Sequence, residues 1–163
     1  MNILYLHGLD SSGLGPEKGK ILEKYGKVFS PAIDYRTSPN SIELLVEQYK
    51  NEKINAIVGS SMGGFLGYYI ADAYKLPSLL FNPALASRPV NQRIPTYQNP
   101  YFSFKQIVLA ANDEVIDPKE TLVFLSKTLQ QHTNYHIHIR QDIPHQIPVN
   151  VFEEEVTMFF KKA

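Results

Sequence analysis

The pentapeptide Gly59-Ser60-Ser61-Met62-Gly63 places a serine between two glycines, directly after an apolar run and directly before a helical pattern. The run at 54–58 is rich in β-branched residues, as buried strands are, and apolar residues recur at helical spacing from about 62 to 75. A sharp turn from strand to helix strains the serine at its centre, and flanking glycines let the two elements cross closely. The spacing therefore predicts that Ser61 is a nucleophile on such a turn, a nucleophile elbow.

The same turn offers a group that could stabilise negative charge. The Met62 N–H stands at the start of the predicted helix, where partial positive charge favours a developing oxyanion. His7-Gly8 ends an earlier apolar run, and the Leu9 N–H that follows is the second expected oxyanion donor. Two simpler interpretations stay open: Ser61 is an ordinary helix N-cap, and the glycine after His7 only forms a turn.

A serine that attacks an acyl carbon needs a base to take its proton and an acid to orient that base. Asp113 follows the apolar run at 106–110, and His145 follows the run at 135–140, so both are expected at the carboxyl edge of one parallel sheet. The chain order of serine, aspartate and histidine is that of the α/β-hydrolases. We therefore predict a catalytic triad of Ser61, Asp113 and His145.

Asp117 competes with Asp113 for the role of the acid. It precedes Pro118 and stands three residues before Glu120, a pattern typical of a helix N-cap. We therefore favour Asp113, although an aspartate at that place could also be a turn residue, and His145 could be an ordinary loop histidine. His7 precedes the serine in the chain, so we expect it to anchor a loop rather than act as the base.

Short apolar runs alternate with helical patterns along the chain, which favours βα units and a mainly parallel sheet. The expected strands are 3–6, 27–31, 54–58, 79–81, 106–110 and 135–140, and the expected helices are 17–25, 40–51, 62–75, 118–130 and 148–162. The predicted fold is therefore a compact α/β fold, with about six strands covered by helices on both faces.

The 163 residues suffice for one domain, 1–163, with a single core. The 16 Lys and Arg balance 16 Asp and Glu, and the longest basic run is Lys161-Lys162, so the charge pattern of a nucleic-acid-binding protein is missing. The lack of cysteine excludes disulfides, thiolate catalysis and cysteine-based metal sites. The segment 1–6 has no basic leader and no apolar run approaches membrane-spanning length, so we expect a cytoplasmic protein without a membrane partner.

The sequence resembles the α/β-hydrolases, and more narrowly the small bacterial YqiA-like esterases, over nearly the whole chain. The likeness rests on Tyr5–Gly8 with Ser11 and Ser12, on Ile57–Gly64, on Asn82–Ala84, on Asn99–Tyr101 and on Asp113–Val115. It implies that Ser61, Asp113 and His145 act as nucleophile, acid and base, with Leu9 and Met62 near the oxyanion. It also implies cleavage of carboxylic ester or thioester bonds without a cofactor.

The segment 84–105 is a long connection that contains three prolines and several aromatic residues. A connection of this length is often functional. We expect it to lie over the catalytic edge as a small cap, with Tyr97 and Phe102 as an apolar wall for an acyl group. Arg88 or Arg93 would then meet an anionic leaving group. The alternative is a structural loop that packs on the core.

Two further patterns carry less weight. Gly15 to Lys20 is one residue short of a phosphate-binding loop, and Ile21 replaces the Ser or Thr that would hold magnesium, so we do not expect nucleotide binding. His136 and His138 share one face of a predicted strand without a carboxylate cluster, which favours an exposed polar face over a metal site.

The sequence thus predicts a serine esterase or thioesterase that acts on a small molecule. The same fold and triad serve acyl transfer to acceptors other than water and carbon–carbon bond hydrolysis, and these alternatives stay open. A non-catalytic binding module on a hydrolase fold is a further alternative. Acyl-chain length, leaving group and oligomeric state are left open by the sequence.

Overall fold

The computed structural model describes residues 1–11, 13–96, 103–129 and 134–163. Strands and helices alternate along the chain, as the apolar runs predict. The strands are β1 (Asn2–Leu6), β2 (Lys27–Phe29), β3 (Ala56–Ser60), β4 (Ser78–Phe81), β5 (Lys105–Ala110) and β6 (Tyr135–Arg140). The helices of the described ranges are α1 (Pro16–Glu23), α2 (Ser41–Tyr49), α3 (Met62–Tyr74), α4 (Pro118–Thr128) and α5 (Val149–Phe160).

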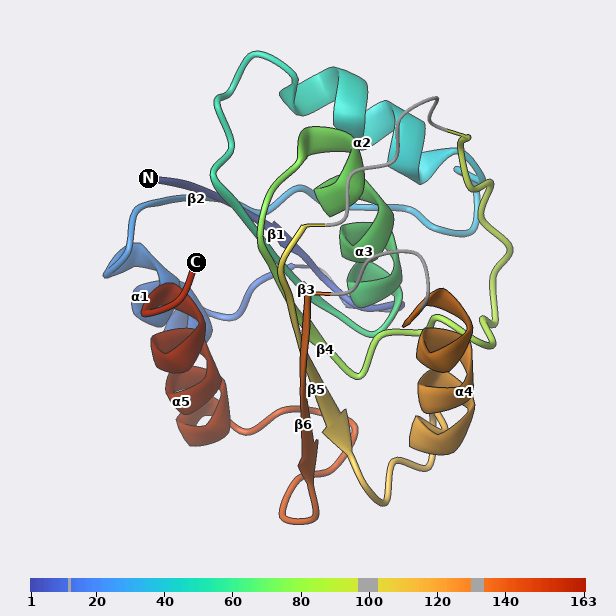
Figure 1. Cartoon of the computed structure of the whole chain (residues 1–163). Coiled ribbons are helices and arrows are strands. Elements are labelled where there is room, and N and C mark those ends of the chain that lie inside the picture. The colour runs from blue at the N-terminus through green and yellow to red at the C-terminus, as the bar shows by residue number, and fades with distance from the viewer. Residues whose placement is uncertain (12, 97–102, 130–133) are drawn as a thin grey trace.

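The strands form one six-stranded sheet in the order β2-β1-β3-β4-β5-β6, and every neighbouring pair is parallel (Figure 1). Helices α1 and α5 cover one face, and α2, α3 and α4 cover the other (Figure 1). Side chains alternate between the two cores, so that Leu4 and Leu6 lie in one cluster and Ile3 and Tyr5 in the other. The predicted α/β fold is confirmed.

The strand order reverses next to β1. The chain goes from β1 outward to β2 and then returns to the other side of β1 to form β3. In open parallel sheets, ligands bind in the crevice at the carboxyl ends of the strands where this reversal occurs. Leu9 follows β1 and Ser61 follows β3, so the topology brings both to that crevice.

Two predicted strands have boundaries that differ from the structure by two residues, and the others agree to within one residue. The third strand begins at Ala56 instead of Ile54 and continues to Ser60, so it leads without a break into the turn that contains Ser61. The second strand ends at Phe29. Pro31, which we included in it, has no N–H to continue a ladder of hydrogen bonds.

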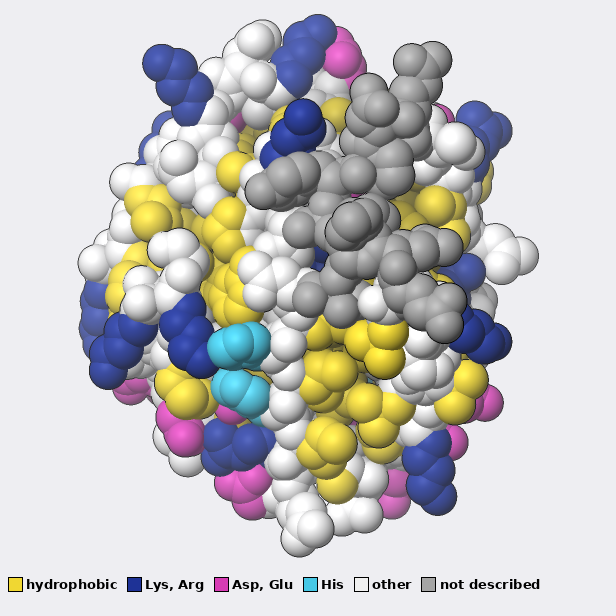
Figure 2. All heavy atoms as spheres, in the orientation of Figure 1, with side chains coloured by type: hydrophobic (Ala, Val, Ile, Leu, Met, Phe, Trp, Pro, Cys, Tyr) yellow, Lys and Arg dark blue, Asp and Glu magenta, His cyan; other side chains and the backbone are white. Residues whose placement is uncertain are grey.

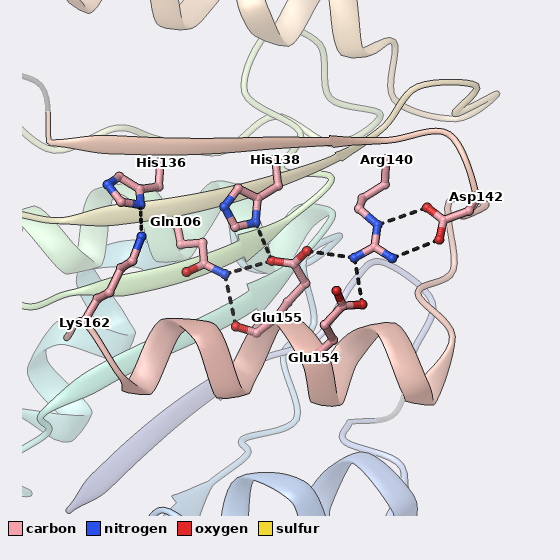
Figure 3. A network of polar contacts seen from close by, with 8 residues as sticks. All are labelled: Gln106, His136, His138, Arg140, Asp142, Glu154, Glu155 and Lys162. Carbon is pink, nitrogen blue, oxygen red and sulfur yellow. Dashed lines mark hydrogen bonds and ion pairs between the residues drawn. The ribbon is translucent and has the colours of Figure 1, made fainter.

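The edge strand β6 presents different side chains to its two sides. Figure 2, in the same orientation as Figure 1, shows histidines on one side of this edge and hydrophobic side chains on the other. The expected exposed polar face is half-buried in the structure, because α5 lies beside His136 and His138 (Figure 3). His138 Nδ1 lies 2.6 Å from a carboxylate oxygen of Glu155, and Lys162 Nζ lies 2.9 Å from His136 Nδ1.

The helices are short and belong to the layers of the sheet. In the described ranges, none of them has the length and apolar character needed to cross a bilayer.

Candidate active site

Ser61 occupies the turn between β3 and α3 in a strained conformation, with φ 55° and ψ −116°. Positive φ is unfavourable for a residue with a side chain and is concentrated at functional sites. Ser61 N–H donates to the Phe81 carbonyl over 2.9 Å, and the Ala84 N–H donates to the Ser61 carbonyl over 3.1 Å, which holds the turn in place. The Ser61 hydroxyl makes no capping hydrogen bond to α3. An ordinary N-cap has an extended backbone and caps with its side chain, so Ser61 does not fit that alternative.

The glycines on either side of Ser61 allow the strand and the helix to cross closely. A Cβ atom at Gly63 would overlap the Leu6 carbonyl oxygen, and one at Gly59 would overlap the Gly63 carbonyl oxygen. Both contacts are with backbone, which has no room to move aside. The predicted reason for the glycine spacing is confirmed.

His145 and Asp113 meet at the carboxyl edge of the sheet. His145 Nδ1 lies 2.7 Å from Asp113 Oδ2, and the two side chains are 22% and 1% exposed. The other carboxylate oxygen of Asp113 accepts hydrogen bonds from the N–H groups of Val115 and Ile116 over 2.8 and 2.9 Å. Asp113 is therefore a turn residue and a histidine partner at once. A carboxylate accepts the Nδ1 proton, which leaves Nε2 of the neutral ring free to accept another.

Asp117 has the separate role predicted for it. It is the N-cap of α4, and its side chain accepts a hydrogen bond from the Lys119 N–H over 2.8 Å. Pro118 is the first helical residue. The structure thus brings Asp113 to His145 and leaves Asp117 at the helix start.

Ser61 and His145 both border two cavities. The first cavity has a volume of about 520 Å³, and Leu9, Met62 and Arg88 also line it. The second cavity has a volume of about 350 Å³ and shares Leu9 with the first. The predicted nucleophile, base and oxyanion residues therefore lie around one place. In the described part of the chain, no hydrogen bond joins the Ser61 hydroxyl to His145, and such bonds often form only when substrate binds.

Asn82 supports the histidine loop, and sequence reasoning assigned it no role. Its side chain is buried, with Nδ2 donating to the His145 carbonyl over 3.0 Å and Oδ1 accepting from the Ala110 N–H over 2.7 Å. It thereby ties the end of β5 to the loop that carries His145. The available signal was a polar residue placed directly after the apolar run that forms β4.

The sequence matches a known family over residues 2–106, which include β1, Ser61 and Asn82. The family is described as Uncharacterised protein family (UPF0227). The chain belongs to this family. It is the YqiA family that the sequence motifs resemble. A search of the curated proteins finds no significant match.

Solved structures with the same fold share few residues with this UPF0227 member. A protein of the α/β-hydrolase superfamily from Xanthomonas campestris is 14% identical over 99% of each chain, with a TM-score of 0.72. Est1E from Butyrivibrio proteoclasticus is 14% identical over 99% of this chain and 87% of its own, with a TM-score of 0.71. A monoacylglycerol lipase from Paleococcus ferrophilus is 14% identical over 96% of this chain and 92% of its own, with a TM-score of 0.70. These likenesses establish the α/β-hydrolase fold of the chain.

A network of charged residues holds the two ends of the histidine loop, 141–148 (Figure 3). Arg140, at the end of β6, donates from Nε and Nη2 to the carboxylate of Asp142 over 3.0 and 2.9 Å. Its Nη1 donates to Glu154 over 2.9 Å and to the buried Glu155 over 3.2 Å, both on α5. Hydrogen bonds to Asp142 and Glu154 raise the pKa of Arg140, and Arg140 lowers the pKa of the Asp142 carboxyl. Arg140 of this UPF0227 protein thus connects β6, the histidine loop and α5.

Arg88 lies in the wall of the first cavity. Its Nη1 donates to the Leu85 carbonyl over 2.9 Å, and its guanidinium carbon lies 4.2 Å from the centre of the Phe65 ring. Arg88 is thus anchored on one side and faces the cavity of Ser61 on the other. Tyr97 and Phe102, the other predicted substrate-binding residues, lie outside the described residues.

The described part of the predicted cap, 84–105, has two environments. Ser87, Arg88 and Pro89 line the first cavity. Further along, the buried side chain of Gln92 donates to the Tyr35 carbonyl over 2.9 Å, which fastens the segment beside α2. Lys105, which we included in this segment, is the first residue of β5.

His7 anchors the loop before α2, as predicted. It is buried, its Nε2 accepts a hydrogen bond from the Ile33 N–H over 2.9 Å, and its Nδ1 lies 2.7 Å from the Gly8 carbonyl oxygen. Because Nε2 accepts, the proton belongs on Nδ1, which donates to Gly8. Both ring nitrogens are used, so His7 has none left for a proton transfer.

Proposed function

We propose that this UPF0227 chain is a serine hydrolase that cleaves a small carboxylic ester or thioester through an acyl-enzyme on Ser61. The observation that carries the proposal is the juxtaposition at the carboxyl edge of the sheet. Ser61 sits on a strained turn and borders the same cavities as His145, whose Nδ1 lies 2.7 Å from the buried Asp113 carboxylate. A free hydroxyl, an oriented imidazole and a buried acid are the parts that acyl transfer requires.

In the proposed reaction, Ser61 Oγ attacks the acyl carbon while His145 Nε2 takes its proton, and Asp113 stabilises the resulting imidazolium. The carbonyl oxygen becomes an oxyanion that accepts hydrogen bonds from the Leu9 and Met62 N–H groups. His145 then protonates the leaving alcohol or thiol as its bond to the acyl carbon breaks. Water attacks the acyl-enzyme, His145 takes a proton from that water, and the carboxylic acid leaves as Ser61 regains its hydrogen. No cofactor takes part.

The first cavity is the proposed site of the acyl group. Its walls include Leu9, Met62, Val115 and Ile116, which are apolar, and Arg88, whose charge borders them. A volume of about 520 Å³ accommodates a small molecule. We propose that Arg88, together with Tyr97 and Phe102, contacts the substrate, and that the enzyme works in the cytoplasm as a single domain.

The proposal is tested by comparing wild type with Ser61→Ala on short-chain p-nitrophenyl esters and acyl thioesters. Loss of the nucleophile should lower kcat/KM by on the order of 10⁴-fold. A serine-directed phosphonate should label wild type at Ser61 and leave the alanine variant unlabelled, as peptide mass spectrometry would report.

Other outcomes separate the alternatives. Labelling of Ser61 without hydrolysis would favour acyl transfer to another acceptor, or cleavage of a carbon–carbon bond, because these share the nucleophile. If wild type neither turns over any ester nor reacts with the phosphonate, the hydrolase proposal is wrong and a binding module replaces it.

A further inference from the structure

The second cavity contains polar side chains that the proposed reaction does not use. It lies on the α1 side of Ser61 and has a volume of about 350 Å³. Its lining includes Tyr5 from β1, Lys18 from α1 and Gln146 from the histidine loop. Ser61 and His145 border it too, so a molecule that fills it reaches the reacting atoms.

Lys18 has no anionic partner in the described part of the chain. Its ammonium lies 5.3 Å from the centre of the Phe152 ring, and burial lowers its pKa. Among the described residues that line the second cavity, it is the only lysine or arginine, and none is acidic. A partly desolvated cation without a counter-charge is unfavourable, so this position favours a ligand that brings negative charge.

Tyr5 is a second unpartnered group in the same cavity. Its side chain is only 6% exposed, and its hydroxyl forms no hydrogen bond with any described residue. The hydroxyl is not among the fully buried atoms that lack a partner, so it is open to the cavity that Tyr5 lines. Burial raises the pKa of Tyr5 to about 12, so the hydroxyl keeps its proton and can donate it to an oxygen in the cavity.

The start of α1 adds donors of the same kind. Gly15 is the N-cap residue of α1, has no side chain to cap the helix, and lines the second cavity. The unpaired N–H groups of a helix start favour negative charge. The spacing around Lys20 does not fit a nucleotide-binding loop, but a single carboxylate or phosphate needs fewer donors.

We infer that the second cavity binds the alcohol or thiol part of the substrate, and that this part carries a carboxylate or a phosphate bound by Lys18 and Tyr5. The inference rests on the proposed function. The apolar walls of the first cavity suit the acyl group of the substrate. The second cavity, which is more polar, is then available for the alcohol or thiol part. His145 borders both cavities, so it can protonate the leaving atom when the substrate spans Ser61.

The test uses three acetyl thioesters that differ in the charge of the thiol part: mercaptopropionate, its neutral amide, and mercaptoethyl phosphate. We expect wild type to prefer an anionic thioester over the neutral one by about tenfold in kcat/KM, the effect of one hydrogen-bonded charge pair. Comparison of the carboxylate with the phosphate shows which anion the cavity takes. The preference should weaken as salt is raised, because the interaction is electrostatic.

The variants test which residues bind the anion. Lys18→Met removes the ammonium that lies over Phe152 and keeps an unbranched side chain, so it should reduce the preference to about one, while Lys18→Arg should retain it. Tyr5→Phe should reduce it by several-fold. Lys20→Met is the matched control, since Lys20 is exposed on the same helix and does not line the cavity, and it should leave the preference unchanged. Thermal unfolding confirms that each variant is folded.

A binding measurement separates this inference from the proposed function. The free thiols mercaptopropionate and mercaptopropanamide are titrated into Ser61→Ala protein, with and without Lys18→Met, and followed by NMR. Hydrolysis with equal preference in wild type and Lys18→Met overturns the anionic subsite and leaves the hydrolase standing. No hydrolysis, with anion binding that depends on Lys18, overturns the hydrolase and leaves the anion site standing. If neither is seen, both are wrong.

Discussion

The two cavities beside Ser61 share their reacting residues and differ in how each holds its cation. In the first, Arg88 donates to the Leu85 carbonyl over 2.9 Å and lies over the Phe65 ring. In the second, Lys18 lies over the Phe152 ring, and no acceptor among the described residues pairs with it. The main chain holds Arg88 through Nη1, although its Nε is buried without a partner among the described residues, whereas no described acceptor holds the Lys18 ammonium, which is available to a ligand.

This difference changes where a charged leaving group is expected. From the sequence, we placed it at Arg88 or Arg93. Arg93 Nη1 lies 3.8 Å from Glu43 and does not line either cavity. The anchored Arg88 suits the acyl side, and Lys18 suits the leaving group. The sequence could not reveal this, because a lysine on an amphipathic helix is usually solvated.

The largest effect is predicted for Asp113, because its partner His145 borders both cavities and reacts with substrate in either. Asp113→Asn should lower kcat/KM by on the order of 10³- to 10⁴-fold, because an amide no longer holds the His145 tautomer that accepts the Ser61 proton. Steady-state kinetics with a thioester that wild type hydrolyses measures this fall in kcat/KM. The matched control is Asp117→Asn, since asparagine caps a helix as well as aspartate does, and activity should stay within about twofold. Equal losses in the two variants would contradict the assignment of the acid.

A smaller effect common to both cavities is predicted for Asn82→Ala. The change removes the donor to the His145 carbonyl and leaves the buried Ala110 N–H unpaired. We expect a loss of about 1–3 kcal/mol in the free energy of unfolding and a fall of about 10- to 100-fold in kcat, because the base is less well positioned. Denaturant unfolding and kinetics measure the two. The preference for an anionic thioester should not change, and a change in it would show that Asn82 acts on one cavity alone.

The fold was predictable because local patterns determine it. Helix α3 was expected from 62 to about 75 and spans Met62–Tyr74, because apolar residues recur there at helical spacing. The sharp turn at Ser61 was predictable for the same reason, because the neighbouring glycines are needed for the close crossing of β3 and α3.

Apart from the Asp113–His145 pair, which chain order and position indicated, the tertiary partners of Asn82 and other polar residues were not predictable. Whether Asn82 or Lys18 finds a partner depends on elements far away in the sequence. The same holds for His138, which we placed on an exposed face. It lies beside Glu155, a carboxylate 17 positions later that α5 buries against the sheet. Alternation along a strand gives the face of a side chain but not what covers it.

Replacing Arg88 should change the first cavity alone. Arg88→Met removes the guanidinium that lies over Phe65 and its bond to the Leu85 carbonyl, and it keeps an unbranched apolar side chain. We expect the relative kcat/KM for short and longer acyl chains to shift by about fivefold, the effect of a modest change in an apolar wall. A panel of thioesters of one thiol with increasing acyl length measures it. The preference between anionic and neutral thiols should remain that of wild type, and its loss would place the anion at Arg88 instead of Lys18.

The pH dependence of the anion preference gives the smallest effect and the sharpest test of the second cavity. Burial lowers the pKa of Lys18, so its ammonium loses its proton at a lower pH than an ordinary lysine does. The preference should therefore decline as pH rises through that lowered pKa. Tyr5, whose pKa is raised to about 12, stays protonated over this range.

The ratio is measured from pH 7 upward, with the rate of the Ser61→Ala protein subtracted as background. In Lys18→Arg, the preference should persist over the whole range, since a guanidinium keeps its proton. A decline that is the same in wild type and in Lys18→Arg would mean that another group titrates. A wild-type ratio that stays constant up to the pH at which free lysine loses its proton would mean that the ammonium is hydrated in the cavity. The contrast between an anchored arginine and an unpartnered lysine would then no longer distinguish the two sides of Ser61.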